Sequence, residues 1–250
     1  MQAQTTGSMG KTVPLYVPCR KLAFSAPFRW LEKGWQDFRR APWHSLAYGV
    51  IFVFSGWLLI YFAWINERDA LIFGLPLGFL IMGPVLAFGL YDISYQLEHN
   101  RTPSFRHERQ KALHEMGHEL MFAMMLGMLF VVLSIVLSMV GGVGPILGEK
   151  TGAYAVGPLL IAATSAGVAF CTGAFALPMI LHRDTDAATA IMTSINAVLR
   201  NKGVCALWAL LIFALIALGF ATALVGLAFI VPVLGYASWH AYRETVPVER

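Results

Sequence analysis

Long apolar stretches without charge alternate with short polar stretches along this chain. Each charge-free stretch can cross a bilayer, since a spanning helix needs about 20 mostly apolar residues. The last stretch is long enough for two helices, with a turn in the small-residue region Gly219–Gly226. The Gly- and Pro-rich region Gly141–Gly157 separates two others, because these residues break helices. The pattern predicts six spans, at about 45–65, 70–92, 119–141, 157–182, 203–222 and 224–241.

The fold class predicted from these spans is an all-α membrane protein. Its transmembrane domain is expected to cover residues 28–242, followed by a short cytoplasmic tail, 243–250. Residues 1–27 contain three prolines and are expected to form a disordered or extended cytoplasmic tail. They lack the apolar core of a signal peptide.

Composition supports the membrane assignment. Apolar residues make up 58% of the chain and charged residues only 13%, against roughly 25% charged in soluble domains. A soluble enzyme or a nucleic-acid module of this size needs more charge to cover its surface. The net charge of +4 is therefore interpreted as membrane topology, with the lipid bilayer as partner and no nucleic acid.

The basic residues predict the orientation. Sixteen of the 18 Lys and Arg residues lie before the first span, in the second and fourth loops, or after the last span. Only Arg68 and Lys150 lie on the other side. Cytoplasmic loops carry an excess of Lys and Arg, so both termini are expected in the cytoplasm. The expected location is the inner membrane of a bacterial cell, with several passes.

An internal repeat relates the even-numbered spans. Pro84-Val85-Leu86 recurs as Pro232-Val233-Leu234, and Pro178 occupies the equivalent place in the fourth span. Each proline lies about two turns from the predicted cytoplasmic end. The repeat predicts three in–out–in hairpins related by an axis along the membrane normal.

A cytoplasmic amphipathic helix is expected before each hairpin. In the third, Asp184 or Thr185 is expected to cap a helix whose apolar residues share one face. The second is expected to start near Ser104. In the first, the apolar face is expected to hold Phe28, Leu31, Trp35 and Phe38, opposite Arg29, Lys33, Asp37 and Arg40.

Ionisable residues are absent from the middle of every predicted span. Such residues mark proton relays and ion pathways, and a midplane haem needs axial ligands such as His. The pattern therefore argues against a proton-coupled transporter and a haem held by two histidines, and no cofactor is expected. All seven histidines lie at or beyond predicted cytoplasmic ends: His44, His99, His107, His114, His118, His182 and His240.

His114-Glu115-Met116-Gly117-His118 matches the H-E-x-x-H pattern. On a helix, this spacing places His114 and His118 on one face as zinc ligands and Glu115 beside a metal-bound water. A zinc hydrolase also needs a third ligand. The candidates are His182, Asp184, Asp186 and Asp92. An ordinary structural role for the same residues, in a loop crowded with charges, stays open.

Several segments resemble one family. They are Gly34-Trp35-Gln36-Asp37-Phe38 with Ala41-Pro42, Gly83-Pro84 with Tyr91, Leu177-Pro178-Met179 with Arg183-Asp184, and the closing run from Pro232 to Tyr242. The chain is similar, over roughly Trp30 to Tyr242, to an uncharacterised family of bacterial integral membrane proteins. Some of its members carry the label cytochrome c oxidase subunit I. The resemblance implies no functional residues, because the family has no established activity.

Three functions remain open at this point. The leading expectation is a non-catalytic accessory or assembly subunit of a respiratory, cytochrome oxidase-type, or other membrane complex, with other membrane-protein subunits as partners. The second is a zinc-dependent membrane metallopeptidase that uses His114, Glu115 and His118. The third is a carrier or channel for a neutral or lipid-like solute.

Overall fold

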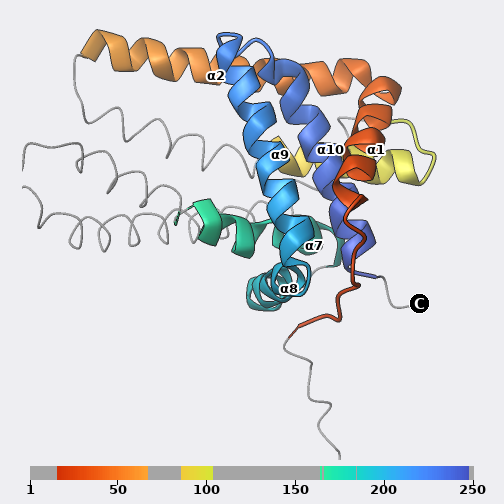
Figure 1. Cartoon of the computed structure of the whole chain (residues 1–250). Helices are drawn as coiled ribbons and strands as arrows, with labels where there is room; N and C mark the ends of the chain where they lie inside the picture. Colours follow the sequence, from red (N-terminus) through yellow and green to blue (C-terminus); the bar gives the residue numbers. More distant parts are fainter. Residues whose placement is uncertain (1–15, 67–85, 104–163, 165, 184, 248–250) are drawn as a thin grey trace, which may run out of the picture.

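A computed structural model describes residues 16–66, 86–103, 164, 166–183 and 185–247. The described residues form helices joined by turns and short extended segments, and they contain no strand. The chain is therefore all-α in these ranges, as predicted (Figure 1). Further helical segments run over 86–98 and 166–173. The named helices are α1 (Ala26–Arg40), α2 (Pro42–Asn66), α7 (Ala176–Arg183), α8 (Ala187–Arg200), α9 (Lys202–Ala221) and α10 (Leu227–Thr245).

Three helical stretches among the described residues are long and apolar enough to cross a membrane. They are Pro42–Phe62, Ala166–Arg183 and Lys202–Ala221, which overlap the predicted first, fourth and fifth spans. The Ala166–Arg183 stretch has a turn at Ala174 and Phe175. Pro178 explains this turn, since it has no N–H to donate to the Ala174 carbonyl four residues earlier.

The other predicted spans are described only in part or carry more polar residues. The helix over 86–98 continues past the predicted end at residue 92. The predicted third span lies outside the described residues. Helix α10 covers the predicted sixth span, but His240, Arg243 and Glu244 in its last turns make it less apolar than the three stretches above. Six spans and their in–out–in order therefore stay a prediction.

The predicted turn at Gly219–Gly226 is confirmed. Helix α9 ends at Ala221, and a run of turns over 222–226 leads into α10. Ala223 and Leu224 adopt φ of 52° and 72°, the left-handed region that usually favours glycine. The Thr222 hydroxyl accepts a hydrogen bond from the Gly226 N–H at 2.8 Å and holds the turn closed. Helices α9 and α10 thus form a hairpin.

Helix α2 crosses this hairpin near its turn rather than lying alongside it (Figure 1). At the crossing, Gly49 faces the backbone of Ala228, whose carbonyl lacks its usual helical donor because that donor would be Pro232. Further along α2, Trp57 Nε1 donates to the Ala223 carbonyl at 3.0 Å. Only glycine fits at position 49, because a Cβ there would overlap the Ala228 main chain.

Helix α1 packs along α10 through a face that only partly coincides with the predicted apolar face. Trp30, Gly34 and Phe38 are buried, and only Phe38 of these was on the predicted apolar face. Asp37, which was predicted on the polar face, is buried as well, whereas Phe28 and Trp35 are 55% and 49% exposed. A Cβ at Gly34 would lie 2.6 Å from the Val233 carbonyl oxygen. The close approach of the two backbones therefore sets which face of α1 turns inward.

One local prediction, the cap of the helix before the fifth span, is wrong, and the described part of the N-terminal tail gains a structural explanation. The N-cap of α8 is Asp186, whose carboxylate accepts from the Thr189 N–H at 2.9 Å. The predicted caps, Asp184 and Thr185, lie before it. Part of the predicted N-terminal tail follows an extended path that is held in place, since the Leu22 N–H donates to Asn201 Oδ1 at 2.8 Å.

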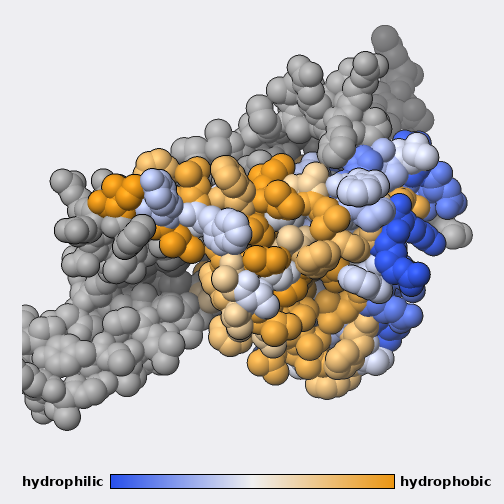
Figure 2. All heavy atoms as spheres, turned by 90° about the horizontal axis from the view of Figure 1, so that it is seen from above, coloured by the Kyte–Doolittle hydropathy of each residue, from blue (hydrophilic) through white to orange (hydrophobic). Residues whose placement is uncertain are grey.

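The core lies where α1, α7, α8, α9 and α10 meet. Trp30 and Trp208 contact edge to face, with ring centroids 5.5 Å apart, and both are buried. Outside this core, much of the surface of α2 and α9 is apolar. Figure 2 shows apolar residues over most of the described surface and polar residues gathered along one side.

Candidate functional site: a charged pocket between α1, α10 and the 86–98 helix

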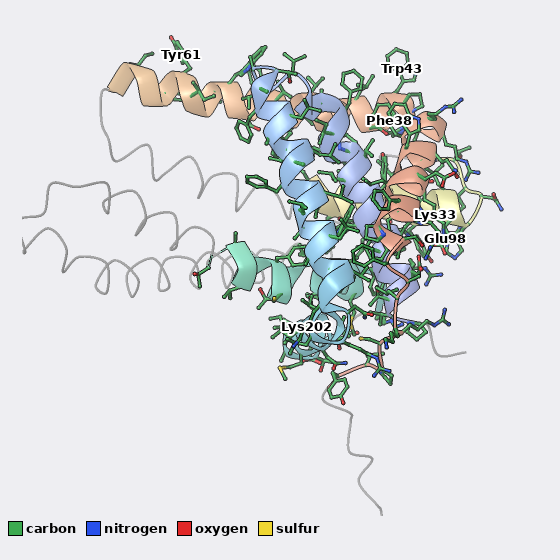
Figure 3. All side chains as sticks on the ribbon, in the orientation of Figure 1. Lys33, Phe38, Trp43, Tyr61, Glu98 and Lys202 are labelled. Atoms are coloured by element: carbon green, nitrogen blue, oxygen red, sulfur yellow. The ribbon has the colours of Figure 1, made fainter. Side chains whose placement is uncertain are left out.

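A pocket of about 590 Å³ opens on the polar side of the molecule. Its walls come from α1, the end of the 86–98 helix and the last turns of α10. Lys33 and Glu98 mark two of these walls in Figure 3. The lining is almost entirely charged or polar: Arg29, Lys33, Gln36, Asp37, Arg40, Glu98, His240, Arg243 and Glu244.

Glu98 connects the 86–98 helix to α10. Arg243 binds it through two guanidinium nitrogens, with Nη2 2.9 Å from Oε1 and Nε 3.1 Å from both oxygens. Trp239 Nε1 donates to Oε2 at 3.1 Å. Partial burial acts to raise the pKa of Glu98, but the hydrogen bonds and charge of Arg243 outweigh it and hold this pKa below its ordinary value.

Glu244 connects α10 to α1 in the same way. Its Oε1 accepts from Arg29 Nη2, and its Oε2 accepts from Trp30 Nε1 at 2.9 Å. Trp30 is also part of the core, so this carboxylate couples the pocket wall to the packed interior. An arginine and an indole together satisfy both carboxylate oxygens.

Asp37 joins all three helical segments at the base of the pocket. Ser94 Oγ donates to Asp37 Oδ2 at 2.5 Å, and His240 Nε2 lies 2.8 Å from the same oxygen. Asp37 is only 5% exposed and Ser94 is fully buried. A buried carboxylate requires such partners, because burial without them is costly. The serine bonds to the aspartate and not to the histidine, so this is not a nucleophile–base arrangement.

His182, a candidate third zinc ligand, lies in an aromatic cluster. Its Nδ1 is 2.9 Å from the Tyr242 hydroxyl, and its ring contacts Trp239 edge to face at 5.5 Å. Arg183 donates to the same hydroxyl from Nε at 3.1 Å. The cluster therefore joins the end of α7 to α10.

The zinc motif lies outside the described residues, as do His114, Glu115 and His118. Of the further candidates, Asp186 caps α8 and Asp92 accepts from Gln96 Nε2 at 2.6 Å. Asp184 is not described. Within the described ranges, no three His, Cys, Asp or Glu side chains gather as a metal site. Whether the motif binds zinc stays a prediction.

The residues of the pocket were not identified from sequence as a site. The one-sided charges indicated the cytoplasmic ends of the predicted spans, where the pocket lies. The pairing was not predictable from local patterns because its partners are far apart in the chain, and Asp37 and His240 are separated by 203 positions. The sequence did contain one signal for this site: Asp37 is an acidic residue among the basic residues of α1.

Comparison with known proteins finds a match to one family model. A family model described as predicted integral membrane protein, domain of unknown function DUF2189, matches residues 71–182. This confirms the resemblance to an uncharacterised membrane family. No curated protein and no solved structure matches the chain.

Proposed function

We propose that this chain, whose residues 71–182 match the DUF2189 model of predicted integral membrane proteins, is a non-catalytic accessory or assembly subunit. Its partner complex would be respiratory, of cytochrome oxidase type, or another complex of the bacterial inner membrane. The proposal includes six spans in three in–out–in hairpins, with both termini in the cytoplasm.

The pairing of the acidic groups in the pocket carries this proposal. Asp37, Glu98 and Glu244 each bind a basic or polar side chain from another helical segment. Glu98 and Glu244 are each held by an arginine and an indole, and Asp37 is held by a serine and a histidine. We interpret the three groups as ties between helices, which is the use expected in a scaffold and not in a reaction centre.

The apolar surface supplies a second support. Beyond its crossing with α10, α2 leaves Phe54, Tyr61 and Ile65 more than half exposed. On α9, Phe213 is 72% exposed. Such faces contact lipid in a membrane, and they also provide the area on which a partner's helices can pack. The exposed aromatic residues of α2 favour a protein partner, because large aromatic side chains contribute much of the binding energy at protein–protein interfaces.

Purification of a tagged full-length chain from its own membranes in a mild detergent tests the proposal. We expect a stoichiometric partner that is lost in a Phe54→Ala, Tyr61→Ala variant of α2. The matched control is Phe24→Ala, an exposed ring in the segment before α1, which should retain the partner. A chain that elutes alone, at the size of one protein in its detergent micelle, would refute the assembly function.

A carrier of lipid-like solutes is the second candidate, and one cavity favours it. A space of about 650 Å³ lies between the 166–171 segment and α9, lined mostly by apolar residues such as Phe170, Ala209 and Ile216. A cavity of this size can hold an acyl chain or a small apolar molecule. Reconstituted vesicles should then exchange a fluorescent lipid between leaflets, and Ala209→Trp should block the exchange. Equal rates with and without the protein would exclude this function.

The zinc metallopeptidase reading of His114, Glu115 and His118 is kept as a third proposal, supported by the motif alone. Elemental analysis of the purified chain should find one zinc per chain, lost in His118→Ala. Protein without bound zinc, or Glu115→Gln with unchanged proteolysis, would remove it.

A further inference from the structure

Helix α1 presents a row of hydrogen-bond donors to the charged pocket. Arg29, Lys33, Gln36 and Arg40 follow one another at helical spacing and all line it. The row extends over about 16 Å, at a rise of roughly 1.5 Å per residue. It is therefore long enough to contact more than one oxygen of a bound group.

Two of these cations have no acidic partner within the part of the chain that the structure describes. Arg29 is paired with Glu244, but among the described residues no carboxylate lies within ion-pair distance of Lys33 or Arg40. The three acids of the pocket are already held by Arg29, Arg243 and His240. The spare charge is thus positive, and the pocket can accept an anion without breaking an existing pair.

The chemistry of the donors favours phosphate. Arginine and lysine are the side chains that bind phosphate oxygens, arginine through its planar fork and lysine as a point charge. The Gln36 amide adds neutral N–H donors. The pocket volume of about 590 Å³ exceeds that of a single phosphate and has room for a larger headgroup.

The position of the pocket indicates the source of the phosphate. Arg40 lies immediately before Ala41 and Pro42, and Pro42 begins a stretch that can cross a membrane. Trp43, at the start of that stretch, is 81% exposed, and Phe28 and Trp35 are exposed on α1. Exposed aromatic rings at the end of a span are typical of the headgroup layer. Figure 3 shows Trp43 at the junction of α1 and α2.

We infer that the pocket between α1, α10 and the 86–98 helix binds the headgroup phosphate of an anionic phospholipid. Lys33 and Arg40 contact the phosphate oxygens. The three ion pairs hold the walls in place around it. The inference does not depend on the assembly function, because a lipid can bind whether or not a protein partner does.

Native mass spectrometry of the full-length chain tests the inference. The chain is incubated with phosphatidylglycerol or with zwitterionic phosphatidylcholine, and the bound lipid is counted. We expect preferential retention of phosphatidylglycerol. The Lys33→Gln, Arg40→Gln double variant should lower its affinity roughly 30-fold, since each basic residue near a lipid surface is worth on the order of a factor of 5 or more.

The matched control removes the same charge outside the pocket. Lys21 and Arg39 are exposed and do not line it. Because charges that do not contact the phosphate are screened by solvent and salt, Lys21→Gln, Arg39→Gln should keep affinity within about a factor of 2 to 3. Unchanged thermal stability in both double variants would show that folding is intact. Equal losses in the two double variants would refute a specific pocket, as would equal retention of the two lipids. Full displacement of the lipid by millimolar inorganic phosphate would assign the site to the free anion instead.

Discussion

Substitution of Gly34 by alanine tests how α1 is positioned. In the structure α1 packs directly on α10, and a Cβ at position 34 would lie 2.6 Å from the Val233 carbonyl oxygen and 2.9 Å from the Ala237 nitrogen. Both atoms belong to the main chain, so no side-chain rotation can make room. The two helices must separate, which disturbs the Glu244 and Asp37 contacts that join them.

Whether Gly34→Ala lowers or raises stability distinguishes α1 packed on α10 from α1 lying alone in the membrane interface. Overpacking costs about 1–3 kcal/mol, whereas glycine to alanine in an unconstrained helix is worth about 1 kcal/mol in the stabilising direction. Packing on α10 therefore predicts a net loss of up to about 2 kcal/mol. A chain of this length loses roughly 2–4 °C of melting temperature per kcal/mol, so we expect a fall of several degrees. A helix lying alone in the membrane interface would instead gain stability.

Thermal unfolding of the detergent-solubilised full-length chain measures the difference, at one fixed heating rate because unfolding of such proteins is often irreversible. The matched control is Gly203→Ala on α9, where a Cβ would meet only Phe24 at 3.7 Å, an ordinary contact. It should leave the midpoint unchanged or slightly raised. A Gly34→Ala variant that melts at or above the wild-type temperature would refute the α1–α10 packing.

Three further outcomes are expected. Glu98→Gln should lower the melting temperature at pH 7. The difference from wild type should shrink as pH falls through the lowered pKa of Glu98, because only the ionised carboxylate stabilises the folded state and protonation removes that contribution. A constant difference down to low pH would contradict this. Asp186→Ala should remove the α8 cap at a cost of about 1 kcal/mol, seen as faster hydrogen exchange of the Thr189 amide, whereas Asp186→Asn should retain most of the protection. Asn201→Ala should release the Arg20–Leu22 segment, so that trypsin cleaves after Arg20 and Lys21 faster than in wild type; equal digestion rates would show that the segment is held by other contacts.

The helices were largely predictable because hydropathy is a local property. The predicted spans 45–65 and 203–222 match α2 and α9 within a few residues. The turn between α9 and α10 was also predicted correctly, since small residues over Gly219–Gly226 mark it directly. Helix α8 was expected, but its first capping residue was placed one or two positions early, because Asp184, Thr185 and Asp186 are all competent caps.

The face of α1 shows where local reasoning fails. The predicted apolar face held Phe28, Leu31, Trp35 and Phe38, and it left out Trp30. Trp30 and Gly34 are buried together with Phe38, because α10 approaches too closely for any side chain at position 34.

Hydropathy and charge along the chain are sufficient to assign it to a membrane and to place its charges at one end of the predicted spans. Both properties follow from sums over neighbouring residues, which need no knowledge of the fold. Which charges pair with each other depends on the packing of the helices. Asp37 contacts His240 and Glu98 pairs with Arg243, and the partners of each pair are more than 140 positions apart in the sequence. The Asp37–His240 pair depends on the close crossing of α1 and α10 at Gly34, and a crossing is a property of two helices together.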